Sequence, residues 1–402
     1  MTLELDPDHL KRIGAWADRY VAQRKFAGLS VLIQQRGKEA YFHSAGVRDV
    51  TKDAPFDRGT VARIYSMTKP VTSLVLMMLV EEGELHLDAP LSRFLPDFDS
   101  PCALVPGAKH LDQVELVAVP TLHQLLTHQS GFSYPFNPGL LPQAMAAQDL
   151  LFKPNASTLA DQCAALAQLP LAFAPGTRWE YSVGIDVIAR VIEVVTGKPL
   201  DQVFQERVFD PLGMTETGFS VPAHARGRFA ALYTPLAGDA MALVGGATGA
   251  DTLRPVDSAD ASPFLDATCF SGGGGLVGTL DDYMRFAECL RIGGGGLVSP
   301  ATADFMMSNH LSGDIASLGP ASFAEQPMEG IGFGIGGAVV INPARSRVPS
   351  SLGDFSWGGM ASTFFWVDRV HDLSVVFFTQ LSPSSSYPAR AELKALVHGA
   401  LM

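Results

Sequence analysis

Apolar and polar positions near the N-terminal end of the chain predict a helix followed by a β-hairpin. From Asp6 to Arg24, apolar residues recur at the spacing of one helix face. Two runs of strand-like composition follow, Leu29–Gln34 and Ala40–Ser44, and a polar turn at Arg36–Lys38 separates them. A strand, a polar turn and a second strand in this order are typical of a hairpin.

The C-terminal part repeats this arrangement in reverse order. Ser362–Val367 and Leu373–Gln380 are rich in Phe and Val, which favour strands, and Asp368–Asp372 forms the turn between them. An amphipathic helix is predicted from Ala389 to Leu401. We therefore expect one antiparallel sheet that is assembled from both ends of the chain and flanked by the N- and C-terminal helices.

The middle of the chain has helical periodicity. The spacing predicts three helices, the last of which stops at Gly197: Leu122–Thr127, Leu159–Leu169 and Ile185–Thr196. Apolar runs do not alternate with helices as a parallel doubly wound sheet requires, so the predicted class is α+β. We expect a discontinuous sheet domain of residues 1–80 and 265–402, a mainly helical domain of residues 81–264, and an active site between them.

Composition and charge disfavour several classes of function. Of the 402 residues, 47% are hydrophobic, and the formal net charge is −12. Nucleic acids and anionic membrane surfaces require a basic face, so neither is an expected partner. The longest apolar stretch, Pro70–Val80, has about half of the ~20 residues that a membrane span needs. The start of the chain lacks the apolar core of a signal peptide, so we expect a cytoplasmic protein.

The cysteine, histidine and glycine patterns do not predict a disulfide, metal or phosphate site. The four cysteines have no tight spacing, which is typical of reduced thiols. His123 and His128 have no third ligand nearby, so we expect them to be core or capping residues. Gly272–Gly275 precede a helix that begins at Thr279, but no Lys-Ser or Lys-Thr pair follows. Close backbone packing or a mobile loop explains these glycines better than a phosphate cradle.

The strongest candidate for chemistry is the tetrad Ser66-Met67-Thr68-Lys69, which opens an apolar helix. Residues three apart share a helix face, so the Lys69 amine is within reach of the Ser66 hydroxyl. A serine hydroxyl becomes a nucleophile when a base removes its proton, and burial favours the neutral, basic form of an amine. The helix N-terminus also favours an oxyanion. The alternative interpretation is a helix cap beside a solvated lysine.

Two further segments are candidates for the same site. Tyr181 follows a Pro-Gly turn and precedes a predicted helix, and a tyrosine beside a lysine can shuttle protons, although such a tyrosine is more often a packing residue. Trp357, Gly358, Gly359 and Met360 precede a predicted strand, where glycines allow close approach of a ligand. The alternative there is an edge bulge with a surface tryptophan. The chain contains no Gly-x-Ser-x-Gly elbow of an α/β-hydrolase.

In order and approximate spacing, these three motifs resemble those of the family VIII carboxylesterases, which are similar to class C β-lactamases and penicillin-binding proteins. The resemblance extends over nearly the whole chain through further segments: Leu125–Gly131, Pro211–Met214, Ser271–Gly275 and Gly332–Gly334. It implies a β-lactamase-like fold. It also implies a serine hydrolase that forms an acyl-enzyme and needs neither a cofactor nor a metal.

Residue by residue, the resemblance implies a Ser–Lys–Tyr site. Ser66 is the implied nucleophile. Lys69 and Tyr181 share the role of the base, and the sequence leaves open which of them takes the proton. The backbone N–H groups of Ser66 and Met360 form the implied oxyanion hole. Five residues are predicted to bind the substrate: Tyr65, Val183, Trp357, Gly358 and Gly359.

Two positions depart from the β-lactamase pattern. Val183 stands where those enzymes usually have an asparagine that holds the β-lactam side chain. Trp357 stands where they usually have a lysine, which attracts a substrate carboxylate. The predicted activity is therefore hydrolysis of small neutral esters with short to medium acyl groups.

Other functions remain open from the sequence. The same acyl-enzyme serves a weak β-lactamase or peptidase, or an acyltransferase in which an alcohol replaces water. A binding protein without activity is a further alternative, but it has no need of Ser66, Lys69 and Tyr181 together. The natural ester and the oligomeric state are not predicted. The loops Tyr134–Pro154 and Leu236–Phe264 lack periodicity, and we expect them to shape the pocket.

Overall fold

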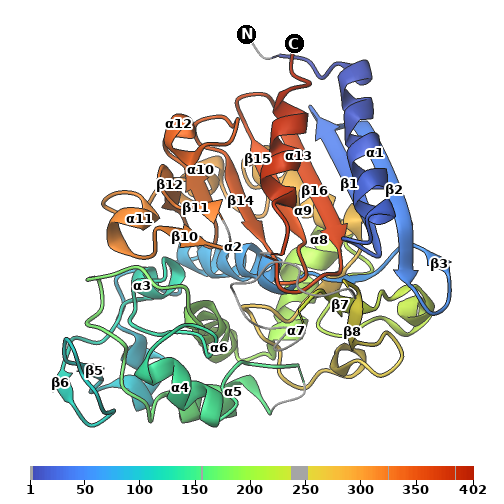
Figure 1. Ribbon diagram of the computed structural model, residues 1–402. Helices are drawn as coiled ribbons and strands as arrows, with labels where there is room; N and C mark the ends of the chain where they lie inside the picture. The colour runs from blue at the N-terminus through green and yellow to red at the C-terminus, as the bar shows by residue number, and fades with distance from the viewer. Residues whose placement is uncertain (1–2, 155–156, 237–251, 325, 385) are drawn as a thin grey trace.

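The computed structural model describes residues 3–154, 157–236, 252–324, 326–384 and 386–402 (Figure 1). The helices in these ranges are α1 (Pro7–Ala22), α2 (Thr68–Glu81), α3 (Leu122–Leu126), α4 (Leu140–Ala147), α5 (Leu159–Leu166), α6 (Gly184–Thr196), α7 (Leu200–Phe204), α8 (Asp210–Leu212), α9 (Leu280–Arg291), α10 (Pro300–Met306), α11 (Ile315–Leu318), α12 (Pro343–Ser346) and α13 (Ala389–His398). The strands are β1 (Gly28–Gln35), β2 (Lys38–Asp49), β3 (Ala54–Pro55), β4 (Ala62–Arg63), β5 (Cys102–Leu104), β6 (Val114–Leu116), β7 (Leu232–Thr234), β8 (Arg254–Asp257), β9 (Val277–Gly278), β10 (Ser322–Phe323), β11 (Gln326–Pro327), β12 (Ile331–Phe333), β13 (Ala338–Val340), β14 (Phe355–Gly358), β15 (Phe364–Asp368) and β16 (Leu373–Thr379).

The two ends of the chain lie side by side in one antiparallel sheet, as the sequence predicted. In the described part of the chain its strand order is β12-β13-β14-β15-β16-β1-β2-β3. β1 pairs with β16 from Leu29 opposite Thr379 to Gln35 opposite Leu373. Figure 1 shows that the two ends of the described chain meet at one end of this sheet, where Leu5 pairs with Leu401. The fold is therefore α+β, with both predicted hairpins in the sheet.

Helices cover both faces of this sheet. On one face, α1 and α13 pack in a single apolar cluster with strand residues such as Val31 and Phe377. On the other face, Leu32 and Phe365 belong to a second cluster, which includes residues of α9 and α2. Consecutive strand residues point to opposite faces, which explains why neighbours such as Val31 and Leu32 serve different clusters.

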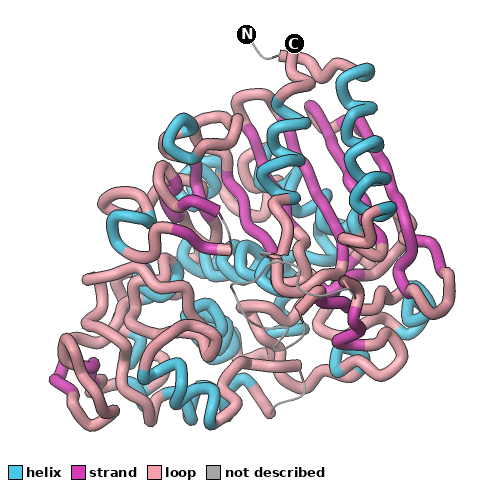
Figure 2. The backbone as a smooth tube through the Cα atoms, in the orientation of Figure 1, coloured by secondary structure: helices cyan, strands magenta, loops and turns pink. Residues whose placement is uncertain are grey.

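The segment between α2 and β9 is mainly helical, as predicted, and it lies below the sheet in Figure 2. Gly197, with φ of 65°, ends α6 as expected. The prediction of a loop over Tyr134–Pro154 was wrong in part, because α4 forms within this segment and buries Leu141 and Met145. In the other expected loop, residues 237–251 lie outside the described residues and β8 follows them. The division of the chain into two domains stays a prediction.

Four strands of the sheet escaped the sequence analysis: β3, β12, β13 and β14. Each has only two to four residues, too few for an alternating pattern to stand out. Trp357 and Gly358 belong to β14, which pairs with β13 on one side and β15 on the other. Trp357 is 9% exposed, so a surface tryptophan at a sheet edge is the wrong interpretation. Among the described residues, no helix is both long and apolar enough to cross a membrane.

Candidate active site

Ser66 lies in a short 3-10 turn, Tyr65–Met67, that leads directly into α2. The pairing of β4 with β9 fixes the chain immediately before this turn. Tyr65 has φ of 43°, a left-handed conformation that is strained by about 1–2 kcal/mol for a residue other than glycine. Burial raises the pKa of the Tyr65 hydroxyl to about 12. Strain of this kind gathers at functional sites, and here it lies immediately before the predicted nucleophile.

The structure brings the three residues of the predicted Ser–Lys–Tyr site together. Tyr181 Oη lies 2.7 Å from Ser66 Oγ, and Lys69 Nζ lies 3.4 Å from the same oxygen. The Lys69 ammonium is 4.6 Å from the centre of the Tyr181 ring. Lys69 is completely buried, whereas Ser66 is partly exposed. A reachable hydroxyl therefore sits above a buried cation and next to a tyrosine hydroxyl.

Lys69 is held by groups that the sequence analysis did not single out. Its ammonium donates to the carbonyl oxygen of Gly273 at 2.7 Å and to Tyr134 Oη at 2.9 Å. Asp186 lies behind both partners, since its carboxylate accepts from the Gly273 N–H at 2.9 Å and from the Tyr134 hydroxyl at 3.4 Å. Burial raises the pKa of Asp186, and the Lys69 charge offsets this only in part. Burial also raises the pKa of Tyr134 well above its usual value, which keeps its hydroxyl protonated.

Tyr181 is surrounded by aromatic rings. Trp357 Nε1 donates to Tyr181 Oη at 3.4 Å. The ring centres of His128 and Phe323 lie 4.8 and 4.9 Å from that of Tyr181. Burial, together with the Lys69 charge, lowers the pKa of His128 well below its ordinary value. His128 is thus a neutral core residue, as predicted, and Trp357 contacts the hydroxyl of Tyr181.

A cavity of about 380 Å³ opens beside Ser66. Its wall is rich in aromatic side chains, which include Tyr65, Phe136, Phe152, Phe264, Phe323 and Trp357. Gly358, Gly359 and Met360 also border it. No described residue accepts a hydrogen bond from the Met360 amide, so this donor is available to a ligand. A nucleophile, an acid–base group and a backbone donor at one apolar cavity are the set that covalent acyl transfer needs.

Val183 does not lie where the sequence analysis predicted. It precedes the first turn of α6, is completely buried, and is not part of the cavity wall formed by the described residues. Its backbone N–H donates to the Ser133 carbonyl at 3.2 Å. A side chain without exposed surface packs the core and cannot touch a substrate. The prediction that Val183 binds substrate was therefore wrong, because its position at the helix start turns it inward.

Tyr134, Asp186 and Gly273 are the parts of the site that the sequence analysis missed. Asp186 carries a usable signal, since it is the only charged residue in the apolar run 181–189 and a buried acid requires partners. Tyr134 lies in a segment without periodicity, so it has no such signal in the sequence. Gly273 acts through its backbone carbonyl, which a pattern of side chains does not reveal.

Known proteins resemble this chain over most of its length. The family model described as Beta-lactamase matches residues 13–399. Esterase EstB of Burkholderia gladioli is 33% identical over 379 residues, which cover 92% of this chain and 89% of EstB. Monacolin J acid methylbutanoyltransferase of Aspergillus terreus is 26% identical over 390 residues, which cover 90% of this chain and 88% of the transferase.

A similar fold occurs among solved structures. EstCE1, described as a hydrolase with promiscuous acyltransferase activity, matches with a TM-score of 0.79 and 29% identity, and the match covers 98% of each chain. The alignment spans nearly the full length of both proteins, so it includes the sheet and the helical segment alike. The chain therefore belongs to the β-lactamase family, which confirms the resemblance to the family VIII carboxylesterases that its three motifs predicted.

Proposed function

We propose that this protein is a serine carboxylesterase that hydrolyses small neutral esters through an acyl-enzyme on Ser66. The observation that carries the proposal is the 2.7 Å distance between Ser66 Oγ and Tyr181 Oη beside the buried Lys69. The apolar cavity next to Ser66 supports short to medium acyl groups as substrates. The similarity to Esterase EstB and to EstCE1 supports ester hydrolysis as the reaction.

Tyr181 is the proposed proton acceptor, because its oxygen is closer to Ser66 Oγ than the amine of Lys69 is. The Ser66 oxygen attacks the ester carbonyl carbon while its proton passes to the Tyr181 oxygen. The Lys69 ammonium near the Tyr181 ring and the Trp357 N–H at the Tyr181 oxygen stabilise negative charge on that oxygen, which its role as a base requires. In this assignment Lys69 acts electrostatically and Tyr181 moves the proton.

The remaining steps balance without any further group. The tetrahedral oxyanion is held by the backbone N–H groups of Ser66 and Met360. The bond from the carbonyl carbon to the alkoxy oxygen then breaks, and the leaving alcohol takes the proton from Tyr181. Water attacks the acyl-enzyme, gives a proton to Tyr181, and the carboxylic acid leaves as Ser66 regains its proton. Tyr65, Trp357, Gly358 and Gly359 are the proposed substrate contacts.

Hydrolysis of a p-nitrophenyl ester with a short acyl group tests this proposal directly. Ser66→Ala removes the nucleophile, and we expect hydrolysis to fall to the background rate. Ser73→Ala is the matched control, because Ser73 lies two turns further along α2 and its buried hydroxyl has no hydrogen-bond partner among the described residues. Full activity of Ser66→Ala would refute the assignment. Mass spectrometry after treatment with an alkyl phosphonate should find the adduct on the Ser66 peptide.

An acyltransferase is the second candidate, and the similarity to monacolin J acid methylbutanoyltransferase favours it. In that reaction an alcohol, instead of water, accepts the acyl group from Ser66. Adding a bulky alcohol to the ester assay distinguishes the two: a transesterified product in excess of free acid supports acyl transfer. Turnover of nitrocefin tests the third option, a weak β-lactamase, against which Trp357 argues because it offers no cation to a substrate carboxylate. A cytoplasmic location stays part of the proposal.

A further inference from the structure

Arg390 approaches the backbone that borders the cavity next to Met360. It lies in the first turn of α13, and its Nη2 donates to the carbonyl oxygen of Gly359 at 3.3 Å. A Cβ atom at position 358 would lie 2.5 Å from the guanidinium carbon of Arg390. Only glycine therefore leaves room for the guanidinium there, which gives Gly358 of the sequence motif a physical reason.

The Gly359 carbonyl and the Met360 N–H belong to the same peptide group. Electron density is shared across a peptide bond, so a positive donor at the oxygen makes the N–H a stronger donor. Met360 N–H is the group that the proposed function assigns to the oxyanion hole. Arg390 itself borders the cavity, and its charge can act on that hydrogen bond through one peptide unit.

We propose that Arg390 is a positioning residue of the oxyanion hole: its guanidinium polarises the Gly359–Met360 peptide and strengthens the Met360 N–H toward the developing oxyanion. This inference rests on the proposed function, in which an oxyanion forms beside Met360.

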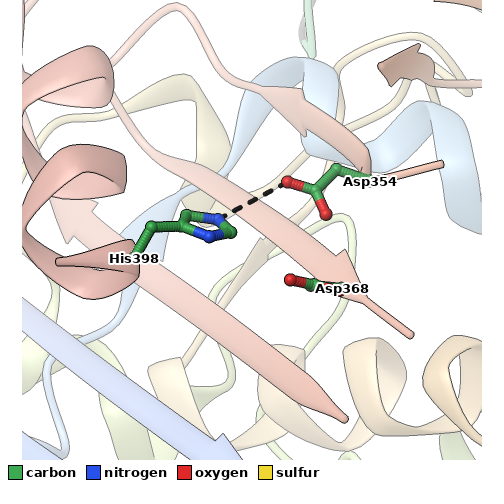
Figure 3. Close-up of side chains that lie close together, drawn as sticks. All are labelled: Asp354, Asp368 and His398. Atoms are coloured by element: carbon green, nitrogen blue, oxygen red, sulfur yellow. Dashed lines mark ion pairs between the residues drawn. The ribbon is translucent and has the colours of Figure 1, made fainter. Parts of the chain in front are cut away.

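Arg390 belongs to a polar stripe on α13. Arg390, Lys394 and His398 are four residues apart and therefore share one helix face. Lys394 Nζ lies 3.1 Å from the carboxylate of Asp354, and His398 Nε2 lies 3.6 Å from it. Asp354 immediately precedes β14, the strand that carries Trp357 and Gly358. Figure 3 shows His398 reaching from α13 toward Asp354, with Asp368 of β15 close by.

This buried cluster ties the helix to the strand that ends at the oxyanion peptide. Burial acts to raise the pKa of Asp354, but the charges of Lys394 and His398 outweigh it and hold that pKa below its usual value. Asp354, Asp368 and His398 each offer a ligand atom within 4.8 Å of the others, as metal ligands do. The Lys394 ammonium already supplies a cation to Asp354, so we assign the cluster to anchoring α13.

The test asks whether replacing Arg390 weakens binding of the transition state, measured by kcat and by phenylboronic acid affinity, or binding of the substrate, measured by KM. Arg390→Met keeps much of the aliphatic stem but removes the donor and the charge, and Arg390→Lys restores a charge. For a neutral p-nitrophenyl ester we expect Arg390→Met to lower kcat about tenfold with little change in KM, a smaller loss than removal of a direct oxyanion donor causes. Phenylboronic acid, whose tetrahedral adduct on Ser66 places an oxygen in the oxyanion hole, should bind weaker by a similar factor. Arg390→Lys should recover part of both losses.

Arg12→Met is the matched control, since Arg12 is exposed on α1 and changes the net charge equally. A kcat of Arg390→Met equal to that of the wild type would overturn the inference, as would a lower kcat with unchanged phenylboronic acid affinity. A rise in KM confined to esters that carry a carboxylate would show that Arg390 binds a substrate anion instead. If Arg390→Met does not fold, the folded Arg390→Lys variant takes its place. Losses of kcat and of phenylboronic acid affinity in Arg390→Lys as large as those expected for Arg390→Met would contradict polarisation by charge. If the wild-type protein neither hydrolyses esters nor forms a phosphonate adduct on Ser66, the proposed function itself is refuted. That result is distinct from each of the outcomes above.

Discussion

At Ser66 a single hydroxyl is served by side chains that each have an ordinary alternative use. Tyr181 resembles a packing residue until its oxygen is found 2.7 Å from Ser66 Oγ. Lys69 resembles a solvated lysine beside a helix cap until its amine is found buried between Tyr134 and the Gly273 carbonyl. What distinguishes these residues is burial with satisfied hydrogen bonds, because an unpaired ammonium would be very unfavourable in the core.

Tyr134 is expected to contribute to catalysis by orienting Lys69. Tyr134→Phe removes the oxygen that accepts a hydrogen bond from the Lys69 ammonium at 2.9 Å. Loss of one hydrogen bond to a charged group should lower kcat about tenfold or more, with KM of a neutral ester changed less. Tyr41→Phe on β2 is the control and should keep the wild-type rate. Equal rates for Tyr134→Phe and the wild type would exclude the orienting role.

His128 makes stability depend on pH. Burial lowers its pKa in the folded protein, so the unfolded chain binds a proton at higher pH than the folded chain does. The stability is therefore complete above about pH 6.5 and is lost as the pH falls below it, by at most about 1.4 kcal/mol per pH unit. His128→Gln should reduce the drop in Tm between pH 7.5 and 5. His123 and His310 also have lowered pKa values, so part of the drop should remain.

The exposed His110 provides the comparison for that measurement. His110→Gln should show the same pH dependence of Tm as the wild type. If the Tm of His128→Gln also has the pH dependence of the wild type, protonation of His128 does not contribute to acid unfolding. Gln is suited to the site because its oxygen can accept from the Ser182 N–H as His128 Nδ1 does at 3.3 Å.

At the scale of elements, the site depends on how closely α2, α6 and the glycine segment 272–275 approach one another. All residues of α2 from Thr68 to Leu79 are buried, so the helix carries no solvent-facing stripe over that length. The glycine segment passes against α6, which brings the Gly273 carbonyl to Lys69. The sequence analysis left close packing and a mobile loop as the two explanations of these glycines, and the contacts favour close packing.

Gly272→Ala should therefore disturb both stability and activity. Its methyl group would collide with the side chain of Ala189 on α6 and lie 3.1 Å from the Ile185 carbonyl. Overpacking of this kind should destabilise the fold by about 1–3 kcal/mol, and displacement of the Gly273 carbonyl should slow ester hydrolysis. Gly227→Ala is the control, because nothing lies within 4 Å of the added atom and the change should be within about 0.5 kcal/mol. Urea unfolding measures the change in stability, and steady-state kinetics measure the change in ester hydrolysis. A Gly272→Ala variant with the stability and the rate of the wild type would contradict the packing argument.

At the scale of the whole molecule, the fold joins the two ends of the chain. β1 lies next to β16, and α1 lies next to α13 on the same face of the sheet (Figure 1). Glu392 on α13 accepts hydrogen bonds from Trp16 Nε1 at 2.6 Å and from Tyr20 Oη at 2.8 Å. Since α13 also carries Arg390, the N-terminal helix supports the site from a distance.

Glu392→Ala should loosen this connection. It leaves the buried polar groups of Trp16 and Tyr20 without an acceptor, and the expected loss is about 1–3 kcal/mol in the free energy of unfolding. Chemical denaturation measures this through the midpoint at an unchanged m-value. Glu115→Ala, at an exposed position of β6 away from this helix pair, is a comparison for removal of an acid. A midpoint for Glu392→Ala equal to that of the wild type would show that the hydrogen bonds between the terminal helices do not limit stability.

The sequence by itself determined the α+β class, the two terminal hairpins, the helical middle, and Ser66, Lys69 and Tyr181 as the candidate centre. The fold features and the Ser66–Lys69 pair follow from periodicity and short spacings, which are properties of neighbouring residues. Tyr181 joined the centre through the resemblance to the family VIII carboxylesterases. The tertiary structure alone decided that Val183 is buried and that Tyr134, Asp186 and the Gly273 carbonyl surround Lys69. It also decided that Arg390 reaches the Gly359 carbonyl. These contacts join residues far apart in the chain, 65 positions for Lys69 and Tyr134 and 204 for Lys69 and Gly273, so no local pattern records them.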